Sequence, residues 1–540
     1  MKISLLPVLI TFLFISSCSK GQKSADASVE EPVAPVNDVL APANDSPLKN
    51  HLGINGFEWD FLNNGVINPA KMENIRSFGV FRHYLDWVRL EATEGSYTFN
   101  PTNSGGWNYD VIYAQCKADG IDVLSCIKVA PPWIIDTYPV GSRDADNVPA
   151  PYGLSRTDPA SYVAQARVGF QFAARYGGNT SVDPALVKVN STPRWTNDPV
   201  NTVKIGLGYI KYVECDNERD KTWKGPLAEQ NPEEYAANMS AFYDGHMGKL
   251  GKNAGVKSAD PNMQVVMGGL SSGDVNYVIR MIEWCKKNRG VKADGSVNLC
   301  FDIINYHLYS NDFNPSTGTS TIGQAPELSK SAALADAFVA MSKKYANGMD
   351  VWITEAGYDV NQKSPTRAYP IDKKSALITQ ADWMLRSTFL YIRHGLKRSF
   401  FYMLDDVNIN DPTQYSSSGF VTETSGKPLR RPVANYFYET KKLMGDFHFV
   451  KTISSDPMVD VYSLGSRTIY VLFVPSDKGT TKSYQLDLGN ATSAKVYTLV
   501  SGENATAETM PKEMAVQTMQ TVNGKLTMTV SETPVFVEKN

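Results

Sequence analysis

The stretch KYVECDNE at residues 211–218 decides the fold that this sequence predicts. An apolar approach over residues 205–213 leads into it, and this approach is rich in the β-branched and aromatic residues that suit a buried strand. The last residues of the stretch are all polar or ionisable. A buried strand that stops on a carboxylate places that carboxylate at one rim of its sheet. We therefore expect Glu218 to lie at such a rim.

A second segment, VWITE at residues 351–355, has the same form, because a short apolar run ends on Glu355. Two glutamates that follow two buried strands are the groups that glycoside hydrolysis requires, one as general acid and one as base or nucleophile. The sequence therefore predicts an active site at Glu218 and Glu355. Alternation along the strand also puts Glu214 and Asp216 on the side of Glu218. One of these neighbouring carboxylates is therefore an alternative candidate for the general acid.

Apolar strands alternate with helical stretches on both sides of these two segments. Helices are expected to begin after Asn68, Asp158 and Asn231, which are residue types that cap helix N-termini. Strands that are apolar throughout favour a parallel sheet covered on both sides, and eight such units favour a closed (β/α)8 TIM barrel in an α/β protein. The expected strands lie at 51–56, 79–84, 121–129, 205–218, 263–269, 301–306, 350–354 and 399–404.

We expect the barrel to cover residues 51–440 and a second domain to follow it at residues 441–540. In the second part, apolar or alternating runs are separated by turn residues, and no helical period of comparable strength interrupts them. This pattern is typical of a small all-β sandwich. Its strands are expected at 459–462, 468–474, 483–488, 494–499, 525–530 and 534–537.

Residues 1–17 have the layout of a secretory signal, with Lys2, an apolar run over residues 3–15 and two serines before Cys18. The run is too short for a spanning helix. The serines before Cys18 resemble a bacterial lipoprotein box, which implies that Cys18 is lipidated; an ordinary cleaved signal peptide is the alternative. Residues 18–50 are expected to form a flexible tether. The sequence thus predicts an exported lipoprotein anchored to a membrane and facing the periplasm or the cell surface.

The composition limits the classes of molecule that this protein is expected to bind. The 540 residues have a formal net charge of −3, which argues against a nucleic-acid groove. An aromatic content of 11% suits either sugar binding or an aromatic core. Cys285 and Cys300 flank one loop and could bridge, with buried free thiols as the other state. CxxC and HExxH spacings are missing from the sequence, so we expect neither a metal nor a cofactor.

Residues at the carboxyl ends of barrel strands face the catalytic mouth. Several side chains besides the two glutamates are expected there and could contact a substrate. They are Asn55, Arg82, Trp133, Asn217, His307, Tyr309 and Tyr402.

The eight-unit layout, Asn217-Glu218 after strand four and Glu355 after strand seven resemble the clan A retaining glycoside hydrolases. Arg82 is similar to the arginine that the clan often carries beside its nucleophile. The residues HLY at 307–309 resemble a His-x-Tyr motif after strand six, and PPW at 131–133 resembles a proline–tryptophan turn of other members. Many members place a tryptophan under the sugar on strand eight, where this chain has Tyr402 in the run FFYML.

The resemblance implies cleavage of β-glycosidic bonds in an oligo- or polysaccharide by double displacement. Glu218 would be the general acid and Glu355 the nucleophile, with Arg82 favouring its charged form. Asn217 would hydrogen-bond the sugar 2-hydroxyl, and Tyr309 would hold Glu355. Two alternatives stay open: a glycan-binding lipoprotein on a degenerate, non-catalytic barrel, and a Schiff-base aldolase, whose nearest candidate lysine is Lys128.

Overall fold

The computed structural model describes residues 43–539 except 64, 315, 425–426 and 502–512. The expected signal segment at 1–17, the lipidation site at Cys18 and most of the expected tether lie outside the described residues. Within the part that is described, no helix has both the length and the apolar character needed to cross a membrane.

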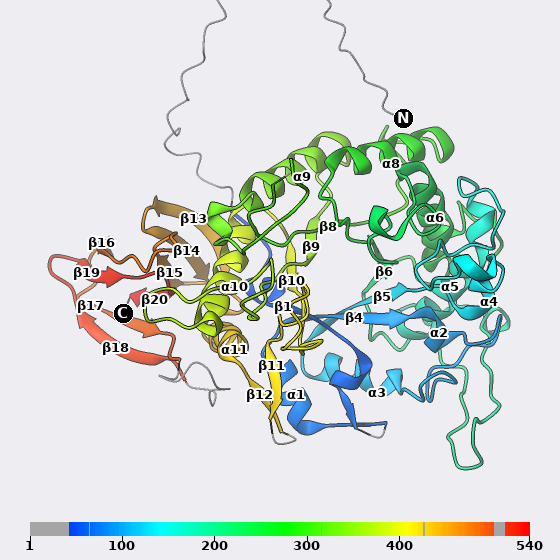
Figure 1. Ribbon diagram of the computed structural model, residues 1–540, viewed down its shortest axis with the longest axis horizontal. Helices are drawn as coiled ribbons and strands as arrows, with labels where there is room; N and C mark the ends of the chain where they lie inside the picture. Colours follow the sequence, from blue (N-terminus) through cyan, green and yellow to red (C-terminus); the bar gives the residue numbers. More distant parts are fainter. Residues whose placement is uncertain (1–42, 64, 315, 425–426, 502–512, 540) are drawn as a thin grey trace, which may run out of the picture. The chain divides into compact units, whose positions relative to one another are not determined.

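Eight parallel strands form a nearly closed barrel, which confirms the predicted fold class (Figure 1). Their order is β7-β6-β5-β4-β1-β10-β9-β8, and parallel bridges Val266–Ile303 and Leu270–Tyr306 bring β7 beside β8. The bounds are β1 (Gly53–Gly56), β4 (Val80–Asp86), β5 (Asp122–Lys128), β6 (Tyr212–Cys215), β7 (Gln264–Met267), β8 (Ile304–His307), β9 (Val351–Glu355) and β10 (Arg398–Phe401). Two hairpins lie outside the barrel: β2 (Leu62–Asn63) with β3 (Val66–Ile67), and β11 (Val421–Thr424) with β12 (Lys427–Arg430).

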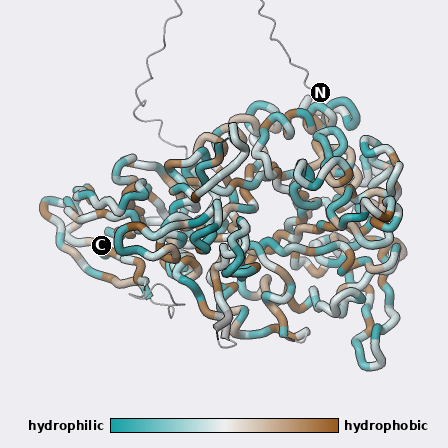
Figure 2. Tube along the Cα trace, in the orientation of Figure 1, coloured by the Kyte–Doolittle hydropathy of each residue, from teal (hydrophilic) through white to brown (hydrophobic). Residues whose placement is uncertain are grey.

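Helices separate the barrel strands, and two of the three expected starts are confirmed, whereas Asp158 caps a 3-10 turn (Pro159–Tyr162) and α5 begins after it. The Asn68 side chain accepts hydrogen bonds from the first turn of α1, and Asn231 and Glu234 form a reciprocal capping box on α6. Figure 2 shows hydrophobic segments recurring along the trace between hydrophilic ones, as such an alternating chain requires. The longer helices are α1 (Pro69–Ile75), α3 (Tyr109–Ala118), α5 (Val163–Tyr176), α6 (Pro232–Asp244), α8 (Val275–Asn288), α9 (Ser331–Tyr345), α10 (Ala376–Arg393) and α11 (Pro432–Met444). Single-turn helices are α2 (Trp87–Leu90), α4 (Pro132–Ile135) and α7 (Val256–Ala259).

The fourth barrel strand is shorter than expected, because residues 205–211 do not belong to it. Their backbone N–H groups bond to carbonyls at the end of α5, for example Gly206 to Ala174 and Tyr209 to Tyr176. Gly206 and Gly208 have positive φ angles of 66° and 64°, which a strand does not use. The apolar run therefore first covers the end of a helix and enters the sheet only at Tyr212.

The C-terminal part consists of antiparallel sheets, as predicted (Figure 1, orange and red). A six-stranded sheet has the order β13-β14-β15-β20-β17-β18, and β16 pairs with β19 in a second sheet. The bounds are β13 (His448–Ser455), β14 (Met458–Leu464), β15 (Arg467–Phe473), β16 (Lys482–Asp487), β17 (Ser493–Thr498), β18 (Ala515–Gln520), β19 (Lys525–Val530) and β20 (Val535–Lys539). Two strands, β13 and β18, were not expected. β18 is exposed along most of its length, and β13 carries two register shifts against β14, so neither has a regular apolar pattern.

The C-terminal sheets are joined to the barrel through α10. Arg393 on this helix pairs with buried Asp460 at 2.5 Å, and the Arg386 guanidinium donates to the Ser476 carbonyl oxygen. The expected boundary between the barrel and the second domain, at residues 440–441, falls inside α11, so the boundary divides this helix.

Residues 43–50, expected as the end of a flexible tether, instead pack against the folded chain. The Asn44 side-chain amide donates to the carbonyl oxygens of Ile392 and Leu396 at the end of α10, and Pro47 bridges to His448. The last carbonyls of a helix have no partner within the helix, which explains why a side-chain donor is accepted there. Cys285 and Cys300 are buried free thiols with their sulfur atoms 3.4 Å apart.

Candidate active site

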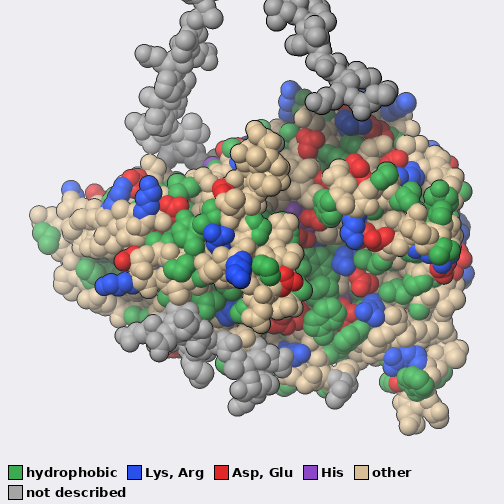
Figure 3. Space-filling view, in the orientation of Figure 1, with side chains coloured by type: hydrophobic (Ala, Val, Ile, Leu, Met, Phe, Trp, Pro, Cys, Tyr) green, Lys and Arg blue, Asp and Glu red, His purple; other side chains and the backbone are tan. Residues whose placement is uncertain are grey.

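A pocket of about 880 Å³ opens at the carboxyl ends of the barrel strands and contains both predicted glutamates. Figure 3 shows hydrophobic and acidic side chains next to one another near the middle of the face it draws. Of the nine side chains expected at this mouth, six line the pocket: Asn217, Glu218, His307, Tyr309, Glu355 and Tyr402.

Glu355 ends strand β9 and is nearly buried, with a partner for each carboxylate oxygen. Oε1 accepts from the Tyr84 hydroxyl at 2.5 Å and from Arg82 Nη1 at 2.9 Å, and Oε2 accepts from the Tyr309 hydroxyl at 3.0 Å. Hydrogen bonds that point at a carboxylate favour its ionised form and fix its orientation. Three donors, two from strand β4 and one from the loop after β8, thus hold this side chain in place.

Tyr84 is a residue of the site that the sequence prediction missed. It lies on β4 two residues after Arg82, and its ring contacts the Arg82 guanidinium at 4.7 Å from the centroid. Since alternate residues of a strand point to the same face, the position of Arg82 already placed Tyr84 on the lumen side. The signal was therefore present in the spacing.

Arg82 is fully buried and joins two carboxylates. It binds Glu214 through Nε at 2.6 Å and Nη2 at 3.0 Å, and Glu355 through Nη1. Glu214 also accepts from the Gly269 backbone N–H and from the Asn305 side chain. Glu214 is thus fully engaged below the pocket and is not positioned as a rival acid.

Removal of Arg82 is expected to destabilise the whole fold. Arg82→Met would leave Glu214 and Glu355 as buried, uncompensated charges, a change that typically costs about 3–5 kcal/mol. Urea unfolding should show a free energy of unfolding that is lower by that amount, and hence a lower midpoint. Arg76→Met is the matched control, because Arg76 forms its ion pairs at the surface, where such pairs contribute about 0–1 kcal/mol. Equal midpoints for Arg82→Met and the wild type would contradict this account of the arginine.

Glu218 lies three residues beyond the end of β6, in a turn that reverses the strand's alternation. Asp216 and Glu218 have φ angles of 66° and 48°, in the left-handed region that non-glycine residues rarely adopt. The Asp216 carboxylate therefore turns to Arg219 and the Asn217 backbone N–H, while the Glu218 carboxylate points into the pocket. The expectation that Glu214, Asp216 and Glu218 share one side fails because the strand has already ended.

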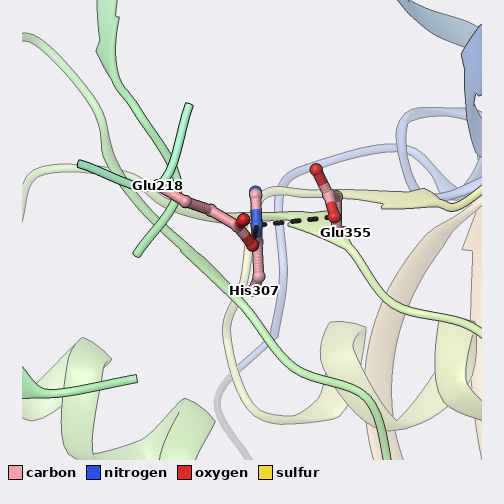
Figure 4. A group of neighbouring side chains, drawn as sticks. All are labelled: Glu218, His307 and Glu355. Carbon is pink, nitrogen blue, oxygen red and sulfur yellow. Dashed lines mark hydrogen bonds and ion pairs between the residues drawn. The ribbon is translucent and has the colours of Figure 1, made fainter. Parts of the chain in front are cut away.

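His307 stands between the two predicted catalytic glutamates (Figure 4). Its Nδ1 lies 2.7 Å from Glu218 Oε1 and 3.6 Å from Glu355 Oε2, and its Nε2 contacts Thr354 Oγ1 at 3.0 Å. A β-carbon at Gly269 would fall 2.0 Å from Nε2, so only glycine permits this approach of the imidazole to the segment that follows strand β7. The nearest polar atoms of Glu218, His307 and Glu355 all lie within 4.8 Å of one another.

The two glutamates have opposite shifts in pKa. Burial and the negative charge of Glu355 raise the pKa of Glu218, against the opposing effect of its hydrogen bond to His307. Burial alone would raise the pKa of Glu355, but the charges of His307 and Arg82 and the Tyr84 hydrogen bond bring it below the usual value. Burial opposes protonation of His307, and the two glutamates nevertheless raise its pKa. The arrangement favours a protonated Glu218 beside an ionised Glu355.

Glu218, His307 and Glu355 are the one group among the described residues with the spacing of metal ligands. Their fit to a cation is poor, because the Arg82 guanidinium already lies 2.9 Å from Glu355 and would repel it. All three side chains also have hydrogen-bond partners within the protein.

Three of the expected mouth residues lie outside the pocket lining. Asn55 is fully buried, and its amide bonds to Arg82 and to the carbonyl oxygens of Thr354 and Phe401, so it supports the arginine and is not available to a substrate. Arg82 itself is likewise covered. Trp133 directs its indole N–H to the Glu91 carbonyl oxygen and packs on Trp87, because the short helix α4 turns it away from the mouth.

Comparison with known proteins relates the fold to glycoside hydrolases. The sequence matches no protein-family model and no curated protein. A family 39 glycoside hydrolase from the gut symbiont Bacteroides cellulosilyticus WH2 superposes with a TM-score of 0.56 at 15% identity, over 92% of this chain and 81% of that one. The family 30 subfamily 8 xylanase Xyn30A from Clostridium acetobutylicum gives 0.52 at 11% identity, over 93% and 98%. BuGH86 in complex with neoagarooctaose gives 0.52 at 12% identity, over 91% and 75%. These likenesses establish a shared fold.

Proposed function

We propose that the chain is a retaining glycoside hydrolase of the clan A type, which cleaves β-glycosidic bonds of an oligo- or polysaccharide. One observation carries the proposal: Glu218 and Glu355 approach within 4.8 Å at the barrel mouth, and their pKa values shift in opposite directions. Retaining enzymes hold their two carboxyl groups about 5–5.5 Å apart, whereas inverting enzymes need about 6.5–9.5 Å to admit a water. The separation favours the retaining mechanism.

The reaction then has two steps. A Glu355 oxygen bonds to the anomeric carbon as the glycosidic C–O bond breaks, and the Glu218 proton passes to the departing oxygen. Glu218, now ionised, takes a proton from water as the water oxygen bonds to the anomeric carbon and the ester bond to Glu355 breaks. Arg82 orients Asn217 by donating to its side-chain oxygen at 2.7 Å, so the amide nitrogen of Asn217 is directed to donate to the sugar 2-hydroxyl. Proton NMR of the first product should show the anomeric configuration of the substrate, and an inverted first product would refute the proposal.

The two pKa shifts predict a bell-shaped pH dependence for kcat/KM. Activity requires ionised Glu355 and protonated Glu218, so the rate rises with pH through the low pKa of Glu355 and falls through the raised pKa of Glu218. Tyr84→Phe removes a hydrogen bond that favours ionised Glu355 and should move the acid limb up by about one pH unit. The alkaline limb should stay in place.

Tyr415→Phe is the control for this change, because Tyr415 also lines the pocket but contacts the rings of Tyr309 and Tyr402, whereas the Tyr84 hydroxyl donates to Glu355 itself. An acid limb that moves equally in both variants, or in neither, would contradict the role assigned to Tyr84.

The alternatives are less well supported. Burial, Arg82 and His307 give Glu218 and Glu355 pKa values that shift in opposite directions. A protein that only binds a glycan does not need such a difference. A Schiff-base aldolase needs a neutral lysine, but Asp86 lies 2.8 Å from Lys128 and, despite burial, raises the pKa of its ammonium group.

We also propose that the protein is exported and held on a membrane by lipid on Cys18, facing the periplasm or the cell surface. The support for this lies in the sequence of residues 1–18 alone. Cys18→Ala should release the protein from the membrane fraction of its host, and retention there would refute the lipid anchor.

A further inference from the structure

Aromatic side chains continue from the catalytic pair along the loop that follows β1. The Tyr84 ring lies 5.2 Å from Phe57, which lines the pocket, and Phe57 stacks on Trp59 with ring centroids 4.2 Å apart and planes at 11°. Trp59 is 41% exposed and lies 6.4 Å from Trp107. This row of rings leads from the Tyr84 ring, beside Glu355, to the surface, and it belongs to a different loop from the one that carries Glu218.

A second set of exposed rings comes from the loops that follow β6 and β8. Trp223, in a single 3-10 turn (Thr222–Lys224) of the loop that carries Glu218, lines the pocket and is 60% exposed. Phe313, in the loop after β8, also lines it and is 47% exposed. Large exposed rings on a pocket wall have no packing role that accounts for them, and their apolar faces suit the C–H faces of sugar rings.

The charges on the pocket wall are compensated within the protein. Lys128 pairs with Asp86 at 2.8 Å and Lys221 pairs with Asp146 at 2.9 Å. Asp216 pairs with Arg219, which leaves Glu218 and Glu355 as the reacting carboxylates.

Among the described lining residues, Lys330 is the remaining cation, and its ammonium group lies over the Phe313 ring at the rim. A wall of this kind offers no set of free cations to a sulfated or uronate-rich chain.

We propose that this pocket binds a neutral β-linked glycan several sugars long, across the catalytic pair, and cleaves it internally. This inference rests on the proposed hydrolase function. Glu218 protonates the departing oxygen, so the leaving part of the chain lies on the side of Trp223, and the part bonded to Glu355 extends over Phe57 and Trp59. An enzyme that removed single sugars from a chain end would need a closed wall next to one of the two glutamates, whereas here exposed rings lie both in the loop that carries Glu218 and next to the Tyr84 ring beside Glu355.

The first experiment compares neutral and anionic polymers of one backbone: hydroxyethylcellulose against carboxymethylcellulose, and desulfated κ-carrageenan against κ-carrageenan, with agarose, xylan and galactomannan as further neutral chains. Internal cleavage should lower the viscosity of at least one neutral polymer well before reducing ends accumulate. Faster cleavage of the anionic member of a pair, or release of single sugars from the start, would overturn the inference. If neither member of any pair nor the other chains are cleaved, the proposed function fails as well.

The second experiment uses oligosaccharides of two to six sugars from the polymer that is cleaved. Trp59→Ala and Trp223→Ala should each lower kcat/KM on the six-sugar chain roughly tenfold, and change it less than about twofold on an aryl glycoside of one sugar. Trp59→Phe should recover most of the loss. Tyr345→Ala is the control, because Tyr345 is exposed at the opposite end of the barrel, beside the N-terminal ends of β6 and β7.

Equal losses on short and long substrates, or no loss on either, would overturn the stacking role. The catalytic proposal is judged separately, since Glu355→Gln should be inactive whatever the tryptophan variants do. Calorimetric binding of the six-sugar chain to Glu355→Gln, with and without Trp59→Ala, gives a readout that needs no turnover. It should show roughly tenfold weaker binding in the double variant.

Discussion

Glu355→Gln is expected to lower kcat by roughly 10⁴-fold or more while the fold persists. The amide is close in size to the carboxylate and its oxygen can still accept from Tyr84, while its NH2 group takes the place of the oxygen that accepts from Tyr309, but the amide is a poor nucleophile for the anomeric carbon. The loss should be equally severe for natural substrates and for aryl glycosides with good leaving groups, because the first step needs the nucleophile in both cases. Steady-state rates and a thermal unfolding midpoint measure the two parts of this expectation.

Glu439→Gln serves as the control, because Glu439 is a buried glutamate of α11 far along the chain from the mouth and caps the Met514 backbone N–H. Glu355→Gly in the presence of azide adds a direct assignment. A small anion can occupy the vacated space and attack from the same face, so the glycosyl azide should have the configuration opposite to that of the substrate. A Glu355→Gln variant within tenfold of wild-type activity would remove the nucleophile from the scheme.

Glu218→Gln should produce a loss that depends on the leaving group. General acid catalysis contributes about 10²–10⁴-fold, and the contribution is needed most when the departing oxygen is a basic sugar alkoxide. Turnover of oligosaccharides should therefore fall within that range or beyond, while formation of the covalent intermediate from a dinitrophenyl glycoside should be much less affected. The alkaline limb of the pH profile, which reports the Glu218 proton, should disappear.

Glu218→Ala with azide distinguishes this residue from Glu355. The intermediate on Glu355 can still form from an activated substrate, and azide then attacks it without base assistance, so the glycosyl azide should keep the configuration of the substrate. A product of inverted configuration would exchange the roles of the two glutamates. A pH profile with an intact alkaline limb in Glu218→Gln would show that another group supplies the proton.

Much of the barrel followed from local patterns in the sequence. Caps at Asn68 and Asn231 fixed helix starts, and the apolar run ending on Glu355 located a strand end correctly, whereas the strand before Glu218 ends three residues earlier, at Cys215. What failed was alternation beyond a strand's last residue. The left-handed backbone at Asp216 and Glu218 redirects both carboxylates. The φ angle of a single residue cannot be predicted from the periodicity of apolar residues.

The mouth residues were predicted by position, and position alone does not say which way a side chain turns. Trp133 follows β5 as expected, yet the turn of α4 directs its ring to Trp87. Asn55 lies in strand β1 as expected, but its side-chain oxygen accepts a hydrogen bond from Arg82 and it does not line the pocket. Tyr84 was overlooked although its spacing from Arg82 was informative. The packing of residues 43–50 depends on the far end of α10, a long-range contact that local composition does not encode.

The coupling between the two glutamates has a consequence for the half-reaction that regenerates the enzyme. Once Glu355 is esterified to the sugar it no longer bears a charge, so one of the causes that raise the pKa of Glu218 vanishes. Glu218 becomes a stronger acid at the moment when it must remain unprotonated to deprotonate water. Arg82 is not left as an isolated cation meanwhile, because Glu214 remains bound to it on two nitrogens. Within one turnover, Glu218 can therefore be protonated while Glu355 is charged and ionised while Glu355 is esterified.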